Sequence, residues 1–224
     1  MMITLSPRLK AAADMSIAAT RIIDVGCDHG YLSAYMLMQK NARYVYACDI
    51  NQGPLDNAAK TADTYGLRDN IEFRLCDGLE PFCGDECDTV FICGMGGELI
   101  ADILSRASWT RDGRHTLILQ PMTRAEKLRE FLSTNGYSID LEKAVEDDGR
   151  VYSVMRVIGA TGDCGSDNRF LFADSMVRDE YFYKYVSKLL DKYRAVYNGK
   201  IKAQNDVAEE SAIIKLLEET YANR

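Results

Sequence analysis

Hydrophobic runs alternate with amphipathic stretches along the first 160 residues. Five runs carry the continuous Ile, Val, Leu and Tyr content that is typical of strands buried on both faces of a parallel sheet: 21–25, 44–50, 71–76, 89–93 and 115–120. The stretches between them have helical character, over residues 31–40, 53–65, 98–106 and 123–135. This alternation of strands and helices predicts a doubly wound α/β domain.

The pattern changes after Gly136. Residues 137–145 and 150–158 are both strand-like, and the four residues between them, Glu146-Asp147-Asp148-Gly149, are typical of a hairpin turn. A parallel sheet that ends in an antiparallel hairpin is typical of Rossmann-like class I methyltransferases, whereas dehydrogenase sheets usually stay parallel throughout. The hairpin therefore favours the methyltransferase version of the α/β fold.

The last quarter of the chain predicts a helical hairpin. Residues 159–168 are rich in glycine and small polar side chains and are interpreted as a linker. Residues 169–198 have apolar side chains at amphipathic helical spacing, and Asn198-Gly199 is expected to end that helix. A second helix carries a short heptad seam, made of Val207, Ile214, Leu217 and Tyr221. We expect a domain of residues 1–160 and a coiled-coil hairpin of residues 169–224.

Composition excludes several classes of protein. In 224 residues, 47% are hydrophobic and 27% are charged, as in globular proteins, and no run reaches the roughly 18 uncharged apolar residues of a spanning helix. The N-terminal segment lacks the apolar core of a secretory signal. Seven cysteines cannot all pair, which favours a reducing compartment. Cys83 and Cys87 have no second Cys/His pair at zinc-site spacing, so no metal is expected. The expectation is a cytoplasmic monomer without a membrane anchor.

Charge is unevenly distributed along the chain. The net charge of −7 argues against a nucleic-acid partner when taken alone. Residues 1–168 contain 17 basic and 25 acidic side chains, whereas residues 169–224 contain 10 and 9. Residues 178–202 contain seven basic against three acidic side chains. This basic stretch is either a solvated helix face or a surface for RNA phosphates, and both interpretations stay open.

Candidate cofactor chemistry follows the first strand, in Asp24-Val-Gly-Cys-Asp-His-Gly30. Gly26 permits close approach of a ligand to the backbone, next to Cys27. The spacing G-x-x-x-G differs from the pyrophosphate fingerprint, and a carboxylate at Asp28 would repel a pyrophosphate. Carboxylates accept hydrogen bonds from an ammonium group, so the loop favours S-adenosylmethionine over NAD or FAD. The alternative is a purely structural strand–helix turn.

Three later strand ends extend this candidate site. Asp49, flanked by Ile50 and Asn51, is placed to accept hydrogen bonds from ribose hydroxyls, and Asp77-Gly78 lies where an adenine amino group is expected. Either acid could instead cap the following helix. The fourth strand ends in Gly94-Met95-Gly96-Gly97. We expect Gly94 to contact the cofactor and the other three residues to contact the methyl acceptor. The alternative is a tight turn without a binding role.

Seven motifs occur in a defined order: Leu5-Ser-Pro-Arg-Leu9, Asp24-Val-Gly-Cys-Asp-His-Gly-Tyr-Leu32, Asp49-Ile-Asn-Gln-Gly-Pro54, Cys76-Asp-Gly-Leu79, Gly94-Met-Gly-Gly97, Gln120-Pro121 and Asp148-Gly-Arg-Val-Tyr152. Together they resemble the bacterial tRNA adenine-22 N1-methyltransferase family over roughly residues 5–158. The resemblance implies an S-adenosylmethionine-dependent enzyme that methylates N1 of an adenine in the D-arm of tRNA. Departures from the family pattern occur at Cys27, Gly30 and Ser33.

Roles for the remaining candidates follow from that expected reaction. Methylation at N1 leaves a cationic base, so Asp28 is the candidate catalytic residue, able to stabilise developing charge or accept an N6 proton. The candidate tRNA-binding residues are rings and cations: His29, Tyr31, Arg8, Lys10, Lys184, Lys188 and Lys192. Two alternatives remain open, a small-molecule or protein methyltransferase and a non-catalytic cofactor-binding scaffold.

Overall fold

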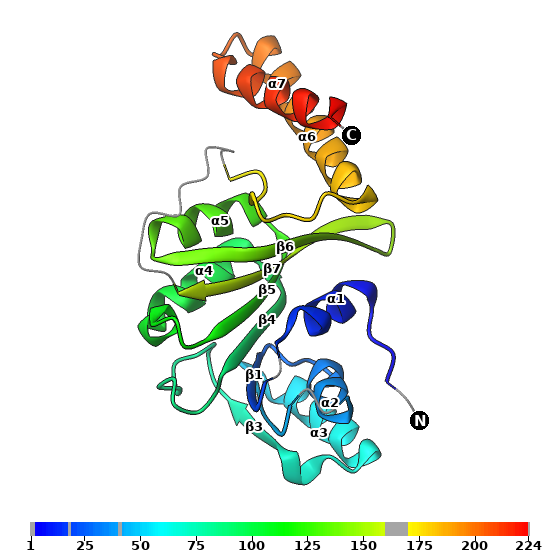
Figure 1. Cartoon of the computed structure of the whole chain (residues 1–224), viewed down its shortest axis with the longest axis vertical. Helices are drawn as coiled ribbons and strands as arrows, with labels where there is room; N and C mark the ends of the chain where they lie inside the picture. The colour runs from blue at the N-terminus through cyan, green and yellow to red at the C-terminus, as the bar shows by residue number, and fades with distance from the viewer. Residues whose placement is uncertain (1–2, 18, 40–41, 160–169, 224) are drawn as a thin grey trace.

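The computed structural model describes residues 3–17, 19–39, 42–159 and 170–223. These residues form one seven-stranded sheet of order β3-β2-β1-β4-β5-β7-β6 (Figure 1). Its strands are β1 (Arg21–Val25), β2 (Tyr44–Asp49), β3 (Ile71–Leu75), β4 (Thr89–Gly96), β5 (Thr116–Thr123), β6 (Tyr137–Asp147) and β7 (Arg150–Gly159). Strands β1 to β5 pair in parallel, and β7 is antiparallel to both of its neighbours. The predicted sheet with an antiparallel terminal hairpin is confirmed.

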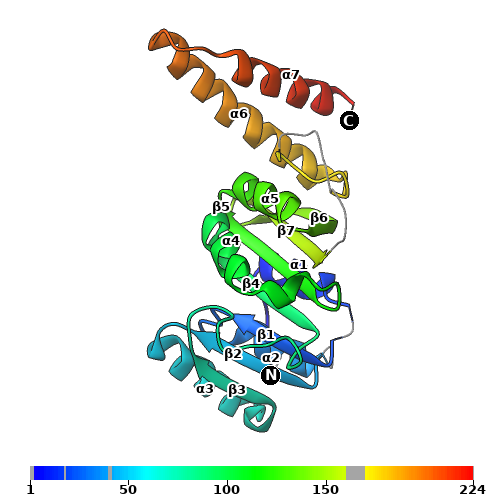
Figure 2. The same ribbon diagram turned by 90° about the vertical axis from the view of Figure 1, so that its left-hand side faces the viewer.

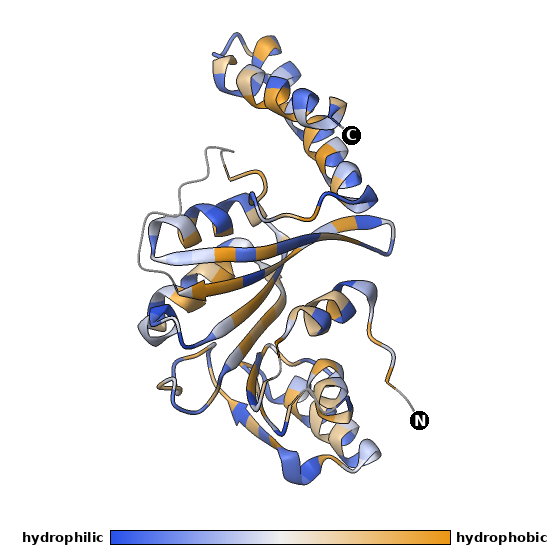
Figure 3. Cartoon of the chain, in the orientation of Figure 1, coloured by the Kyte–Doolittle hydropathy of each residue, from blue (hydrophilic) through white to orange (hydrophobic). Residues whose placement is uncertain are grey.

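Helices cover both faces of this sheet because successive strand residues point to opposite sides. Ile22 of β1 packs with one group of helices and Ile23 with the other. The first group is α1 (Pro7–Met15), α2 (Tyr31–Met38) and α3 (Gln52–Tyr65); the second is α4 (Gly97–Arg106) and α5 (Ala125–Thr134). Short 3-10 turns, η1 (Arg68–Asn70) and η2 (Ser108–Arg111), precede β3 and β5. Figure 3 shows the hydrophobic positions concentrated in the central strands.

Two helices extend beyond the sheet, α6 (Glu180–Lys202) and α7 (Ala208–Ala222) (Figure 2). The chain folds back between them, and the ring of Tyr183 near the start of α6 lies 6.2 Å from that of Tyr221 near the end of α7. A third hydrophobic cluster joins Phe182 and Val186 of α6 to Ala144 and Val151 of the β6–β7 hairpin. The helical hairpin is therefore anchored on the sheet through the first half of α6.

Two boundaries of the predicted helical hairpin are wrong. Helix α6 begins at Glu180, capped by Asp179, whose Oδ1 accepts from the Phe182 amide at 3.0 Å. Part of the segment before it follows β6 instead, where the Val177 amide donates to the Glu142 carbonyl at 2.9 Å. Asn198-Gly199 does not end α6, because a glycine within an exposed helix lowers stability by only about 1 kcal/mol relative to alanine.

The heptad seam is only partly found. Leu217 is fully buried and Ile214 packs against the third cluster, but Tyr221 is exposed and Val207 precedes the helix. Ile213 is buried instead, four residues before Leu217 on the same helix face. The structure thus shows two contacting helices without the full predicted seam.

Some expectations fall on residues outside the described ranges. These are the linker interpretation of residues 160–168, the end at Lys40 of the helix predicted over 31–40, and both internal domain limits, 160 and 169. Gly159, expected in the linker, is instead the last residue of β7. Within the described residues, none of the helices combines the length and apolarity needed to cross a membrane.

Candidate functional site

A cavity of about 390 Å³ opens at the carboxyl ends of β1 and β4. These neighbouring strands connect onward to helices on opposite faces of the sheet, which is where ligands bind in open α/β sheets. The cavity brings together eleven of the residues predicted from the sequence: Arg8, Asp24, Gly26, Cys27, Asp28, His29, Tyr31, Asp49, Asn51, Gly94 and Met95.

The loop after β1 is shaped by Gly26. Its φ of +70° favours glycine, and a Cβ there would lie 2.3 Å from the Met95 methyl carbon. The amides of Gly26 and Cys27 both donate to the Cys48 carbonyl, at 2.8 and 3.0 Å. The loop is therefore held tightly to β2, with Met95 directly over Gly26.

Asp24 places a buried carboxylate at the floor of the cavity. It is 3% exposed, and its Oδ2 accepts a hydrogen bond from the Ser33 hydroxyl at 2.6 Å. Burial raises the pKa of Asp24 to about 6; the hydrogen bonds from Ser33 lower it, and the charge of Asp49 adds to the increase. The ionised carboxylate is thus incompletely compensated in the cavity as it stands, which favours a cationic ligand group.

Asp28 lies at the mouth of the cavity, with 73% of its side chain exposed. Its φ of +49° is uncommon for a non-glycine residue and turns the chain into α2. The His29 ring lies 3.7 Å from its carboxylate and stacks on Tyr31 with 5.6 Å between ring centroids. Tyr31 is 47% exposed, so its ring is not part of the protein core.

A smaller cavity of about 130 Å³ lies beside the first and shares Gly26, Asp49 and Met95 with it. Its apolar lining includes Ile50 and Leu99, which are 64% and 49% exposed. Large exposed apolar side chains in the lining of a small pocket suit a flat aromatic ring. The predicted residues Ile50, Asp77 and Gly78 are brought together here.

Both acids of the smaller cavity also have local structural partners. Asp49 Oδ1 accepts from the Asn51 amide at 2.9 Å and so shapes the turn into α3. Asp77 faces Arg106 of α4, with two nitrogen–oxygen distances of 3.1 and 3.2 Å. The Arg106 contact was not expected from the sequence, since 29 residues separate the partners.

Arg8 reaches the larger cavity from α1, which lies against the β6–β7 hairpin (Figure 1). Its Nη1 donates to Gln120 Oε1 at 3.0 Å, and its Nε lies 3.2 Å from Asp147 Oδ2. The same Gln120 oxygen accepts from the Gly94 amide at 3.1 Å. Gln120 is fully buried and was not among the predicted site residues, although it ends the strand predicted over residues 115–120 and so pointed to this edge.

The other two glycines of the Gly-Met-Gly-Gly turn differ in their packing. A Cβ on Gly97 would lie 2.3 Å from the Arg124 carbonyl oxygen, and one on Gly96 would lie 3.4 Å from the Thr123 hydroxyl. Neither glycine lines the two cavities described above. Close approach of the Arg124 backbone therefore accounts for Gly97, whereas a Cβ at Gly96 would make an ordinary van der Waals contact.

The four predicted RNA-binding lysines lie outside the main cavity and have partners within the protein. Lys10 pairs with Asp14, and Lys184 with Glu146. Lys192 lies 2.8 Å from Glu126, and Lys188 Nζ donates to the Val151 carbonyl at 2.9 Å. Exposed pairs of this kind contribute at most about 1 kcal/mol, so they leave the lysines available to a stronger anion.

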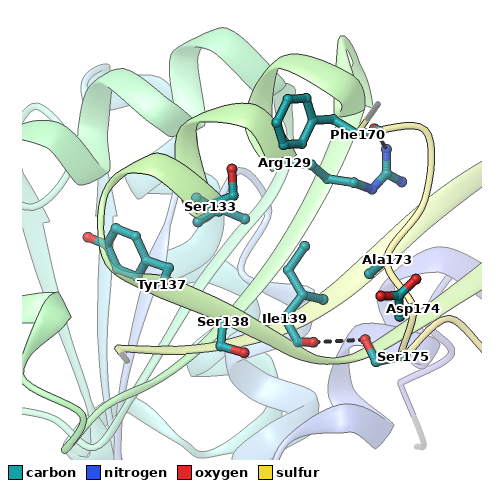
Figure 4. A pocket seen from close by; sticks show the side chains of 10 residues that line it. Arg129, Ser133, Tyr137, Ser138, Ile139, Phe170, Ala173, Asp174 and Ser175 are labelled. Carbon is teal, nitrogen blue, oxygen red and sulfur yellow. Dashed lines mark hydrogen bonds between the residues drawn. The ribbon is translucent and has the colours of Figure 1, made fainter. Parts of the chain in front are cut away.

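A separate cavity of about 300 Å³ lies between α5, the start of β6 and residues 170–175 (Figure 4). It shares no lining residue with the two cavities at the carboxyl edge. Arg129 in its wall is buried and paired with Glu142. Nothing in this lining suits the reaction expected from the sequence.

The part of the chain that the structure describes contains no candidate metal site. No group of three or more His, Cys, Asp or Glu side chains there could hold a metal ion. The six cysteines within the described ranges are free thiols. Burial raises the pKa of the Cys27 and Cys93 thiols, which keeps them protonated.

Comparison with known proteins agrees with this site. The methyltransferase-domain family matches residues 5–155. The tRNA (adenine(22)-N(1))-methyltransferase of Bacillus subtilis is 35% identical over 173 residues, 77% of this chain and 73% of that protein. Among solved structures, a Streptococcus agalactiae protein of the NADB-Rossmann superfamily is 28% identical, with a TM-score of 0.85 and 99% of both chains covered.

A second solved structure includes a cofactor product. M. capricolum TrmK, in complex with S-adenosyl-homocysteine, is 25% identical with a TM-score of 0.80, covering 97% of this chain and 98% of that one. The family match thus covers residues 5–155, and the structural similarity extends over nearly the whole chain. This chain belongs to the methyltransferase-domain family and, within it, to the tRNA (adenine-22-N1)-methyltransferases.

Proposed function

We propose that the protein transfers a methyl group from S-adenosylmethionine to N1 of adenine 22, in the D-arm of tRNA. The observation that carries this proposal is the acidic cavity at the β1–β4 edge, in a chain of this family. Relatives named as tRNA methyltransferases favour it over a small-molecule or protein methyltransferase and over a scaffold.

The two adjoining cavities fit S-adenosylmethionine. The incompletely compensated carboxylate of Asp24 suits the ammonium group of the cofactor, and Asp49 suits its ribose hydroxyls. Ile50 and Leu99 suit the two faces of its adenine, with Asp77 at the edge. The backbone of Gly26, Cys27, Asn51, Gly78 and Gly94 completes the proposed cofactor site. When bound, the cofactor supplies an electrophilic methyl group.

The target base needs positioning more than activation. Adenine N1 has an in-plane lone pair, so alignment and exclusion of water are the main contributions expected of the protein. N1 lies on the Watson–Crick edge, and the base must therefore be unpaired or flipped out of its stack. The exposed rings of His29 and Tyr31 at the cavity mouth are suited to stack on such a base. Arg8 and Met95 also line this cavity, whereas Gly96 and Gly97 do not.

Asp28 is the proposed catalytic residue, whose charge would stabilise a cationic methylated adenine. Its carboxylate lies at the mouth and could also accept the N6 proton. Lys10, Lys184, Lys188 and Lys192 are proposed contacts for tRNA phosphates outside the cavity. We further propose residues 1–160 and 169–224 as two functional units of a monomer in the cytoplasm. The division is supported by the third hydrophobic cluster, which is distinct from the two on the sheet faces and takes most of its residues from α6 and α7.

A direct test is methyl transfer to tRNA. The purified protein, incubated with labelled S-adenosylmethionine and total tRNA, should yield 1-methyladenosine on nucleoside analysis. A tRNA transcript with adenine 22 should be methylated, and the matched transcript with guanine 22 should not. Labelling of both transcripts to the same extent, or of neither, would contradict the proposed target.

Replacing Asp28 with alanine should lower the single-turnover rate about 10- to 100-fold, at or below the lower limit of the usual range for acid–base groups, because this carboxylate is largely exposed. Affinity for S-adenosylmethionine should change less than about twofold, since Asp24 and Asp49 stay in place. Asp14→Ala, which removes an exposed carboxylate paired with Lys10, is the control. An unchanged rate together with lost cofactor affinity would rule out a catalytic role for Asp28.

A further inference from the structure

A cationic groove lies at the junction of the sheet and α6. It has a volume of about 220 Å³ and is bounded by the end of β5, the start of α5, the start of β7 and α6. We call it the junction groove and define it by Thr123, Arg124, Tyr152, Lys188 and Lys192. It shares no lining residue with the cofactor cavities, and of its five defining residues only Lys188 and Lys192 were among the site residues predicted from the sequence.

Positive charge in the junction groove exceeds the negative charge that could neutralise it. Arg124, Lys188 and Lys192 line it, and Glu126, which pairs with Lys192, is the single carboxylate among its lining residues. The ammonium group of Lys188 lies 5.7 Å from the centroid of the Tyr152 ring. Burial and the nearby charges of Arg150 and Lys192 lower the pKa of Lys188, which shows how closely these cations are gathered. An anion in the groove would relieve this repulsion.

Two of the cations have no carboxylate partner among the described residues. Arg124 and Arg150 are both exposed and form no ion pair there. Lys188 donates only to a main-chain carbonyl, that of Val151. Guanidinium and ammonium groups left unpaired around a concave surface are the usual elements of a phosphate site.

The backbone of Arg124 is held in an unusual conformation. Its φ of +56° and ψ of +37° are left-handed, which raises the free energy of a non-glycine residue by about 1–2 kcal/mol. Its carbonyl accepts from the amides of Lys127 and Leu128 and packs onto Gly97, so the position is imposed by the surrounding structure. Glycine would satisfy this geometry without strain, yet an arginine stands here with its side chain in the groove. Backbone strain retained at a non-glycine residue in this way indicates a functional role for the Arg124 side chain.

The junction groove is also next to the proposed reaction site. In the β4–β5 register, Met95 of the larger cavity pairs with Pro121 and Gly96 pairs with Thr123 of the groove. Neighbouring strands lie about 5 Å apart, so groove and cavity open on the same sheet edge within a few strand spacings. A polynucleotide with one base in the cavity would carry its flanking backbone across the groove.

We propose that the junction groove binds backbone phosphate of the RNA strand next to the target adenine, through Arg124, Lys188 and Lys192, with Arg150 at the rim. This inference rests on the proposed function, because it takes tRNA as the substrate. It adds Arg124 and Arg150 to the RNA-binding surface. It also assigns Lys188 and Lys192 to a defined anion site on the catalytic edge.

Charge removal in the full-length protein tests the groove. Arg124→Gln and Lys188→Gln should each weaken tRNA binding about 5- to 10-fold near 0.1 M salt. Each should also reduce the slope of log K against log salt by about 0.7–0.9, the value for one lost phosphate contact. Affinity for S-adenosylmethionine should stay unchanged in both variants. Lys127→Gln on the outer side of α5 and Lys215→Gln on α7, both exposed lysines paired within their own helices, are the matched controls.

A second Arg124 variant separates binding from folding. Arg124→Gly relieves the left-handed strain, so it should raise the melting temperature slightly while losing as much tRNA affinity as Arg124→Gln. Groove variants with the affinity and salt slope of the wild type would overturn the inference, even if the wild-type protein methylates tRNA. A wild-type protein that does not methylate tRNA would instead overturn the proposed function.

Discussion

Asp24→Asn should weaken S-adenosylmethionine binding about 100-fold and should remove a pH-dependent loss of stability from the cofactor-free protein. The expected loss of affinity corresponds to about 3 kcal/mol, within the range for removing one partner of a buried charged hydrogen bond. It follows from the position of this carboxylate, which is 3% exposed in the cavity floor and bonded to the Ser33 hydroxyl.

The sign of the stability effect follows from the raised pKa of Asp24, about 6 against an ordinary 3.8. The folded protein holds the Asp24 proton more tightly than the unfolded chain does, so protonation of Asp24 stabilises the folded state. This contribution to the free energy of unfolding is fully present below about pH 4. It is lost as the pH rises through about 6, by about 3 kcal/mol for a shift of this size. The difference in unfolding free energy between wild type and Asp24→Asn should therefore change by that amount between pH 4 and pH 7.5.

Denaturant unfolding of both proteins across this pH range measures the effect, and calorimetric titration measures cofactor binding. Asp56→Asn, which removes an exposed carboxylate on α3, should match the wild type in both experiments. Saturating cofactor should restore wild-type stability at neutral pH, since an ammonium group beside Asp24 lowers its pKa. Cofactor affinity within about threefold of the wild type in Asp24→Asn would contradict the proposed role.

Local patterns predicted the sheet and one edge of the site. Buried strands carry continuous hydrophobic runs, and Asp24, Asp49 and Asp77 lie at or near the ends of these runs. The strands and the acidic residues could therefore be located from neighbouring residues alone. Carboxyl ends of parallel strands meet at one edge, which is why Asp24 and Asp49 line a single cavity and Asp77 the adjoining one.

Contacts between distant parts of the chain could not be predicted in the same way. Arg106 faces Asp77 across 29 residues, and Arg8 meets Gln120 across 112. The hydrophobic periodicity of the sequence does not indicate such pairs, because in the sequence each partner resembles an ordinary polar surface residue. The basic stretch of α6 shows the same limit, since Lys184 and Lys192 pair with acids of the sheet domain.

The largest stability effect is expected at a buried network that joins the two functional units. Arg129 of α5 is 3% exposed and lies against the fully buried Glu142 of β6. Arg129 also donates to the Phe170 carbonyl at 3.1 Å and to the Tyr185 hydroxyl of α6 at 3.2 Å (Figure 4 shows Arg129 and Phe170). Glu142 in turn accepts from the Ala173 amide at 2.7 Å. One ion pair thus holds the segment that leads into α6.

Arg129→Met should lower the free energy of unfolding by about 3–5 kcal/mol, because it leaves the Glu142 carboxylate buried without a cation. The double variant Arg129→Met/Glu142→Gln should lose less, since no uncompensated charge remains. Hydrogen exchange should accelerate more over residues 170–190 than over β1 and β4, because Phe170, Ala173 and Tyr185 lose their anchor. A truncation at residue 160 cannot replace this test, since it would remove Phe182 and Val186 and so expose their apolar partners Ala144 and Val151 on the β6–β7 hairpin. A loss below about 1 kcal/mol in Arg129→Met, or uniform exchange across the chain, would show that α6 is held by its apolar contacts alone.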